Sequence, residues 1–318
     1  MPSKTQDKNR YSTSQLLNFA SGSYLDRTSR PVYALVFLLP FIIFYEIGTL
    51  LINTDILSRS QIRVVAFVWL QDLLDYAGFD SKFTWIAAPL AVLVILLALQ
   101  LTSRTSWKVR LKDILPMAGE CVVLAIPLIV LSLLLNRPAT TLPQGDVPAN
   151  AAVVSSATAA GVQNYGGVAW PEAKRGHVIT SAQSMPTPRP QGKSPFLVNV
   201  ITGIGAGIYE ELIFRLILVC ALMLLFQDII GLTHTTSMVI AIGVSAALFS
   251  LHHHIIFMHG RFDQTAVFSW SPFLFRTVAG VYFAGLFAIR GFGITAGTHA
   301  FYDILAAAMN AFFFGAAE

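Results

Sequence analysis

The sequence predicts an all-α fold, a polytopic integral membrane helical bundle of about seven or eight transmembrane helices. Hydrophobic residues make up 55% of the 318 positions and charged residues only 12%, whereas soluble domains carry about a quarter charged residues. The apolar residues gather in long runs that alternate with short polar segments, which is typical of chains that cross a bilayer repeatedly. The net charge of +4 then indicates basic loops that touch membrane lipid, and we expect no nucleic-acid partner.

Seven apolar runs have the length of about 20 residues that a membrane-spanning helix requires. The run at 196–226 is longer than one span needs, and Gly203, Gly205 and Gly207 near its start predict a tilt or a break there. The seven predicted spans are residues 31–53, 83–102, 113–135, 196–226, 237–258, 271–290 and 291–313.

Residues 56–77 are a different kind of segment, because two arginines and two aspartates interrupt their apolar residues. These charges argue against a span, so we predict an amphipathic helix that lies on the membrane interface. If the segment did span, it would be an eighth transmembrane helix, and every later loop would change sides.

Basic residues are concentrated in two segments. Residues 1–30 carry five Lys or Arg against two Asp, and residues 103–112 carry four Lys or Arg and no acid. Because Lys and Arg in short loops favour the cytoplasmic side, both segments are predicted to be cytoplasmic. Two predicted spans lie between these segments, so the chain leaves the cytoplasmic side and returns to it, which agrees with this placement. We therefore expect a cytoplasmic N-terminal segment at 1–30 and a location in the bacterial cytoplasmic membrane.

Residues 137–194 are rich in Pro, Ala, Ser, Thr and Gly and lack a long apolar run. Such a segment cannot bury enough apolar surface to offset the entropy lost on ordering. We predict a disordered or mobile polar insertion at this point. It divides the chain into N-terminal transmembrane helices at 31–136 and a second transmembrane region at 195–313.

Ionisable residues within the predicted spans cluster on three helices of the second region. Charged side chains that face lipid are costly, so we expect the three clusters to face one another. They are Glu210, Glu211 and Arg215 in "EELIFR", His252, His253 and His254 after Phe249 in "FSLHHH", and His299 and Asp303 in "HAFYD".

Spacing within these clusters assigns different surroundings to their members. Glu211 and Arg215 are four residues apart, so they share a helix face and can form an ion pair. Glu210 is rotated by about 100° from Glu211, so one carboxylate can pair with Arg215 while the other faces a cavity. His299 and Asp303 are also four residues apart, so Asp303 can hydrogen-bond the imidazole and orient it.

A buried carboxylate beside two imidazoles can carry out hydrolysis. The carboxylate takes a proton from water, one histidine shares that proton or gives it to the leaving amine, and another stabilises the oxyanion. The same groups could bind a divalent metal such as zinc, since one Glu and two His form a known catalytic zinc set. The chain has no HExxH motif, and the residue pattern leaves both mechanisms open.

Several of these residues also have a purely structural interpretation. A Glu–Arg pair most often ties helices together, and three consecutive histidines point around a helix, so at most two of them face one pocket. Glu46 and Glu120 are expected to hydrogen-bond between helices, and Arg276 and Arg290 to extend from span ends toward the interface. Polar clusters on three separate helices nevertheless favour a functional site.

The three motifs, in this order on successive spans, resemble the CPBP family of intramembrane proteases, also called the Abi or CAAX-protease and bacteriocin-processing family. That family carries EExxxR, FxxxH and HxxxN or HxxxD, which here read EELIFR (210–215), FSLHH (249–253) and HAFYD (299–303). The resemblance covers about 195–313 and makes that region the expected catalytic core.

The resemblance also implies roles for individual residues. Glu210 matches the catalytic glutamate that activates water, and His253 matches the histidine that works with it. His299 and Asp303 match the pair that stabilises the oxyanion, although the family often has Asn in the last position and an ionised Asp cannot donate. If a metal is present, the implied ligands are Glu210, His253 and His299. The supporting positions are Glu211, Arg215 and Phe249.

The function implied by the resemblance is endopeptidase cleavage of a membrane-associated protein or peptide, lipidated or not. Two alternatives stay open. One is a non-catalytic immunity or scaffold membrane protein of the same fold. The other is a proton-coupled transporter, because buried Glu, His and Asp also suit a proton relay, but the lack of an internal repeat argues against it.

Overall fold

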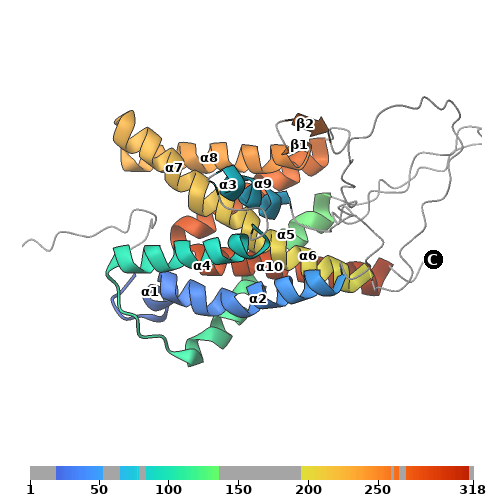
Figure 1. Cartoon of the computed structure of the whole chain (residues 1–318), viewed down its shortest axis with the longest axis horizontal. Helices are drawn as coiled ribbons and strands as arrows, with labels where there is room; N and C mark the ends of the chain where they lie inside the picture. The colour runs from blue at the N-terminus through green and yellow to red at the C-terminus, as the bar shows by residue number, and fades with distance from the viewer. Residues whose placement is uncertain are drawn as a thin grey trace, which may run out of the picture.

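The computed structural model describes residues 19–52, 65–76, 78, 84–135, 195–258, 261–264 and 270–314, so the predicted insertion at 137–194 lies outside the described residues. Within these ranges the chain is almost entirely helical, which confirms the predicted all-α membrane bundle (Figure 1). The α-helices are α1 (Tyr24–Thr28), α2 (Pro31–Ile52), α3 (Val65–Tyr76), α4 (Thr84–Ser103), α5 (Ile114–Leu135), α6 (Pro195–Glu211), α7 (Cys220–Met223), α8 (His234–His252), α9 (Trp270–Arg290) and α10 (Phe292–Met309).

Five helical stretches among the described residues are long and apolar enough to cross a bilayer. The predicted spans at 83–102 and 291–313 correspond to α4 and α10, which are not among these five, so a count of seven or eight is not confirmed. The five stretches are Pro31–Leu51, Leu111–Leu135, Phe196–Ile229, His234–His252 and Trp270–Arg290.

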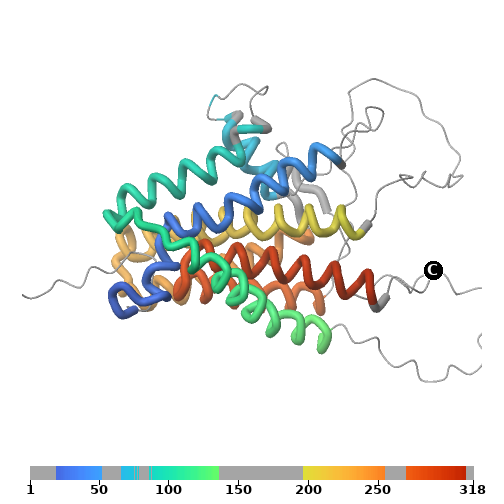
Figure 2. The backbone as a smooth tube through the Cα atoms, turned by 90° about the horizontal axis from the view of Figure 1, so that it is seen from below, coloured from blue at the N-terminus to red at the C-terminus, as the bar shows by residue number. Residues whose placement is uncertain are grey.

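Helix α10 occupies the centre of the bundle and packs against α2, α5, α6 and α9. Figure 2 shows it (red) running between α6 (yellow) and α5 (green). All of its residues from Phe292 to Ala300 are buried. A helix enclosed by other helices has little contact with lipid, so it can carry a histidine that would be costly on a lipid-facing helix.

Glycines on α6 allow α10 to come close. A Cβ at Gly207 would lie 2.5 Å from the backbone nitrogen of Ala300, and one at Gly203 would lie 2.6 Å from Cβ of Asp303. Their four-residue spacing places both glycines on one helix face, the arrangement by which membrane helices approach backbone to backbone. The motif residues of α10 are therefore brought directly against those of α6.

The long run at 196–226 does not break at its glycines, so the prediction of a break there is wrong. Helix α6 continues unbroken from Pro195 to Glu211, and the irregularity comes afterwards. The helix widens into a π-helix, η2 (Leu212–Val219), passes through α7 and widens again in η3 (Leu224–Ile229). π-Helical turns inside α-helices are frequent at functional sites, and η2 begins directly after the two glutamates.

The span predicted at 237–258 ends earlier than expected. Helix α8 stops at His252, and a hairpin of β1 (Ile255–Met258) and β2 (Arg261–Gln264) follows, with Ile255 opposite Gln264. A short apolar run such as "IIFM" has no periodicity that separates a strand from the end of a helix. The consequence is that the three consecutive histidines lie at a helix terminus and in the turn beyond it.

Helix α3 covers the described part of the segment predicted to lie on the membrane interface. Its 12 residues extend about 18 Å at 1.5 Å per residue, too short to span a bilayer. One face packs into the bundle, where Ala66, Phe67 and Leu70 are buried and the Phe67 ring meets that of Tyr209 edge-on. Leu73, further along the helix, is exposed.

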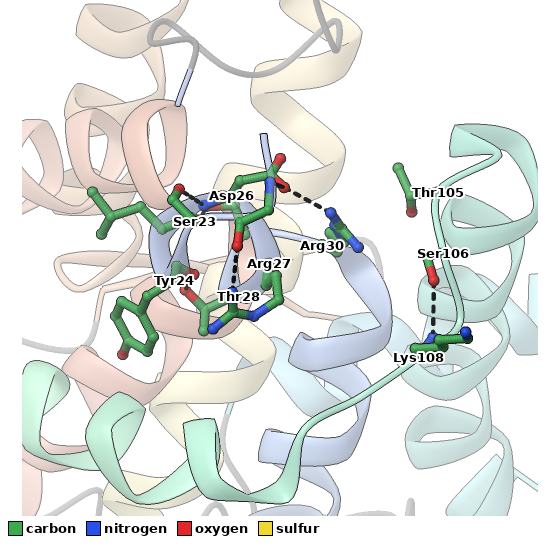
Figure 3. A network of polar contacts seen from close by, with 12 residues as sticks. Ser23, Tyr24, Asp26, Arg27, Thr28, Arg30, Thr105, Ser106 and Lys108 are labelled. Carbon is green, nitrogen blue, oxygen red and sulfur yellow. Dashed lines mark hydrogen bonds and ion pairs between the residues drawn. The ribbon is translucent and has the colours of Figure 1, made fainter. Parts of the chain in front are cut away.

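The described parts of the two basic segments predicted to be cytoplasmic, residues 19–30 and 103–112, lie at one end of the bundle, where each contacts a residue next to the other. Arg27 donates two hydrogen bonds to the carboxylate of Asp113 (3.0 and 3.2 Å), and the Tyr33 hydroxyl accepts one from the backbone nitrogen of Arg110 (3.0 Å). Figure 3 shows α1 beside the loop that follows α4. This placement agrees with one span leaving that end and one span returning to it.

Arg290 lies at the same end and does not extend to the interface as predicted. It is only 5% exposed and makes a bidentate ion pair with Glu120 (2.6 and 2.9 Å). It also donates to the hydroxyls of Thr28 and Ser29 (2.8 and 2.9 Å). Tyr24 donates to Glu120 as well, and burial together with this hydrogen bond raises the pKa of Tyr24. Glu120 therefore hydrogen-bonds between helices as predicted, and Arg290 ties α9 and α5 to α1.

Candidate active site

Two adjacent glutamates at the end of α6 are both buried but have different neighbours. Glu211 lies 3.0 Å from Nε of Arg215 through one carboxylate oxygen and accepts a 2.7 Å hydrogen bond from Nδ1 of His299 through the other. Glu210 faces imidazoles instead, among them those of His252, with Nε2 at 3.7 Å, and His299, with Nε2 at 4.0 Å. The rotation of about 100° between neighbouring helical residues accounts for this division.

Arg215 is fully buried and is held by both charge and aromatic faces. Its contact with Glu211 is a close ion pair whose N–H is not aligned for a hydrogen bond. Nη2 donates to the carbonyl of Gly280 (3.3 Å), and the guanidinium lies over the ring of Phe249, 4.2 Å from its centroid. A second ring, that of Phe283, lies 5.6 Å away. Cation–π contacts of this kind are strongest where water is excluded.

The end of α8 presents two imidazoles to Glu210. Nδ1 of His252 and Nδ1 of His253 both point at the backbone carbonyl of Phe249, the latter at 2.9 Å. The two ring centroids are 3.9 Å apart. The FxxxH motif thus has a physical basis in the described geometry, because the phenyl ring of Phe249 covers Arg215 while its carbonyl oxygen orients the histidines.

His299 projects from the centre of α10 into the same cluster. Its Nδ1 is bound to Glu211, and Asp303 lies 3.7 Å from its Nε2, beyond hydrogen-bonding distance. The imidazole is therefore oriented by Glu211 on α6, whereas the spacing predicted that Asp303 would orient it. The ring of Phe283 stacks on that of His299 with centroids 4.5 Å apart and an angle of 18°.

The three predicted motifs thus converge from α6, α8 and α10, and a comparison with known families covers the same stretch. Residues 192–305 match the type II CAAX prenyl endopeptidase Rce1-like family. This region is therefore similar to the CAAX protease family. The match confirms the resemblance and contains all three motifs. No curated protein and no solved structure matches the chain.

At family level, the match supports a CAAX-protease-like intramembrane endopeptidase. Its membrane character agrees with the five apolar stretches long enough to cross a bilayer. A protease of this family acts on a protein or peptide, so the expected partner class is a polypeptide in a membrane context.

The residues of this CAAX-protease region that could hold a metal differ from the expected set. Among the described residues, Glu210, His252 and His253 bring one ligand atom each within 4.8 Å of one another. His299 is not part of this group, although its Nε2 lies 4.0 Å from Oε2 of Glu210. Two imidazoles and a carboxylate are donors that suit zinc and similar divalent ions.

Sequence reasoning singled out His253 and did not single out His252, whose Nε2 lies 3.7 Å from Oε1 of Glu210. The run of three histidines was the available signal, since it required that one or two face a common pocket. Three aromatic side chains of the site were also missed. No motif marks them, and their rings reach the site only through the packing of their helices. They are Trp69 and Phe214, whose rings lie 5.6 and 4.8 Å from that of His252, and Phe283.

Proposed function

We propose that this protein hydrolyses a peptide bond in a membrane-associated protein or peptide, with Glu210 as the general base that activates water. The observation that supports this best is the contrast between the two buried carboxylates. Glu211 is engaged by Arg215 and His299, whereas Glu210 faces the imidazoles of His252 and His299. A carboxylate that faces imidazoles rather than a permanent cation can accept a proton from water.

In the proposed reaction, a water molecule loses a proton to Glu210 while its oxygen forms a bond to the carbonyl carbon of the substrate. The carbonyl oxygen becomes an oxyanion. His299, protonated on both ring nitrogens, donates from Nδ1 to Glu211 and from Nε2 to this oxyanion. The proton on Glu210 then passes through His253 or His252 to the leaving nitrogen as the C–N bond breaks.

Supporting roles follow from the same contacts. The pair of Glu211 and Arg215 holds the glutamate helix and orients His299. Asp303, 3.7 Å from Nε2 of His299, can stabilise the charge of the protonated imidazole when ionised or donate to the oxyanion when protonated. Phe249 and its carbonyl fix the histidines at the end of α8.

We propose a substrate that is anchored in the bilayer. The site is buried among helices that are long enough to cross a membrane, so a polypeptide held at the membrane has the shortest path to it. The name of the matched family points to prenylated CAAX sequences as the first substrates to try.

The test is a cleavage assay with purified protein in liposomes and two matched sets of membrane-anchored peptides, one prenylated and one carrying a transmembrane anchor. Mass spectrometry in heavy-oxygen water reads both the cut position and the source of the new carboxyl oxygen. We expect fragments that carry one solvent oxygen in the new C-terminus. Intact peptides in the presence of folded protein would reject the proposal and favour the non-catalytic alternative.

A further inference from the structure

We propose that Trp69 of α3 is a positioning residue that fixes the imidazole of His252 with its Nε2 toward Glu210. The inference rests on the proposed function, in which His252 is one of two histidines that take the proton from Glu210. The indole of Trp69 meets this imidazole edge-on, with ring centroids 5.6 Å apart. Trp69 precedes all three motifs in the sequence, so the contact forms only through the packing of α3.

The contacts that His252 makes within its own helix leave its ring incompletely fixed. Nδ1 points at the carbonyl of Phe249, three residues earlier, and this contact holds one ring atom. The χ2 torsion of histidine is broad, so the ring can tilt about that atom and move Nε2 away from Glu210. His252 is also the last residue of α8, and helix ends fray. Contacts from other elements therefore decide where Nε2 points.

Aromatic rings from two other elements enclose the imidazole of His252. Phe214 of η2 lies 4.8 Å from it at an angle of 35°, and Trp69 of α3 meets it at 61°. The rings of Phe214 and Trp69 also contact each other, with centroids 6.2 Å apart. Phe214 is held in turn by Ser245, whose hydroxyl donates to its carbonyl (2.7 Å). Aromatic pairs have preferred geometries, so two contacts at different angles restrict the tilt of the imidazole.

Helix α3 can hold Trp69 in place because it is packed beside the glutamate helix. Phe67, two residues before Trp69, meets the ring of Tyr209 edge-on with centroids 4.9 Å apart. Tyr209 directly precedes Glu210 on α6. Side chains two positions apart on a helix diverge by about 200°. Helix α3 thus contacts the glutamate helix with one side chain and the histidine at the end of α8 with another.

A contact with substrate is the competing interpretation of Trp69, because this side chain is only half-buried. The two roles differ in their kinetic signature. A residue that positions His252 changes kcat, and its effect depends on that imidazole. A residue that only binds substrate changes KM and leaves kcat unchanged.

The kinetic test compares Trp69→Leu with Trp69→Phe on a membrane-anchored peptide in liposomes. We expect Trp69→Leu to lower kcat by about 2- to 10-fold, the range that an aromatic pair contributes, with KM unchanged. Trp69→Phe keeps a ring and should recover most of the rate. In a His252→Asn background, Trp69→Leu should lower kcat no further, because it acts through the missing imidazole. Trp107→Leu, an exposed tryptophan in the loop after α4, is the matched control. If Trp69→Leu does not fold, Trp69→Met replaces it.

A spectroscopic test needs no cleavage. In protein labelled with ¹³C at histidine, the NMR signal of the His252 ring is assigned by its loss in His252→Asn. We expect one sharp His252 signal in the wild type and in Trp69→Phe, and a shifted and broadened signal in Trp69→Leu. The signal of His234, at the other end of α8, should be the same in all three proteins.

The outcomes separate this inference from the proposed function. An unchanged kcat in folded Trp69→Leu, an effect on KM alone, or an equal loss of kcat with and without His252 would overturn the positioning role. Cleavage by the wild type together with an unchanged His252 signal in Trp69→Leu would overturn it as well. Failure of the wild type to cleave any peptide, with the His252 signal still responding to Trp69→Leu, would overturn the proposed function and leave the contact established.

Discussion

At the scale of single residues, the site depends on how two adjacent carboxylates are given different partners. Glu211 sits between Arg215 and His299, and Glu210 faces imidazoles from the end of α8 and from α10. The sequence predicted this division from helical rotation and i,i+4 spacing alone. The sequence could not show which of His252 and His253 faces Glu210, because the directions of these side chains depend on where α8 ends.

Glu211→Gln should destabilise the protein more than any surface change. It removes the counter-charge of the fully buried Arg215, and breaking a buried ion pair by removing one partner costs about 3–5 kcal/mol. Thermal unfolding in detergent measures the effect. The double variant Glu211→Gln with Arg215→Met, which removes both charges, should recover part of the loss. A Glu211→Gln protein that melts with the wild type would contradict the assigned pairing.

At the scale of elements, three helices meet because two of them can approach closely. Gly203 and Gly207 let α10 come against α6, and neither contact is visible in a motif. The apolar runs predicted most helices because span length and hydropathy are local properties. They missed the π-helical widening of η2 and the hairpin after α8, since both depend on tertiary packing.

The central position of α10 also explains why its predicted span is not confirmed by hydropathy. Its small and polar residues lower its hydropathy, and it is not among the five helices apolar enough to cross a bilayer by that measure. The sequence nevertheless identified it as the helix that carries His299 and Asp303. Burial by neighbouring helices, which the sequence does not record, replaces the apolar surface that a lipid-facing helix needs.

Gly207→Ala should separate α6 from α10. The added Cβ would lie 2.5 Å from a backbone nitrogen of α10, an atom that cannot move without shifting the helix. Overpacking of this kind costs about 1–3 kcal/mol, and we expect cleavage to fall as well because His299 moves with its helix. The matched control is Gly243→Ala on α8, where a Cβ meets nothing within 4 Å. Equal melting temperatures and equal cleavage for the two variants would argue against the close approach.

At the scale of the whole molecule, one end of the bundle is tied together by charge while the site lies within the helices. Arg290 joins α9 and α5 to α1, and Arg27 joins α1 to Asp113. The sequence predicted that the two basic segments share an end, because Lys and Arg bias and span counting are global constraints. It did not predict that a span-end arginine would be buried.

Arg290→Met should release α1 from the bundle. The variant leaves Glu120 without its ion pair, and because that carboxylate is 20% exposed we expect a loss below the 3–5 kcal/mol of a fully buried pair. Limited proteolysis should cut within residues 19–30 faster than in the wild type. Lys108→Met, an exposed basic residue at the same end, serves as the control. Unchanged proteolysis in Arg290→Met would show that α1 is held by other contacts.

The most direct measurement is the single-turnover rate at which Glu210→Gln cleaves a membrane-anchored peptide in liposomes. The substitution keeps the shape of the side chain and removes its ability to take a proton from water, so the rate should fall by about 10²–10⁴-fold. Asp228→Asn, an exposed carboxylate on the same helical stretch, should leave the rate unchanged. Cleavage by folded Glu210→Gln at the wild-type rate would contradict the account.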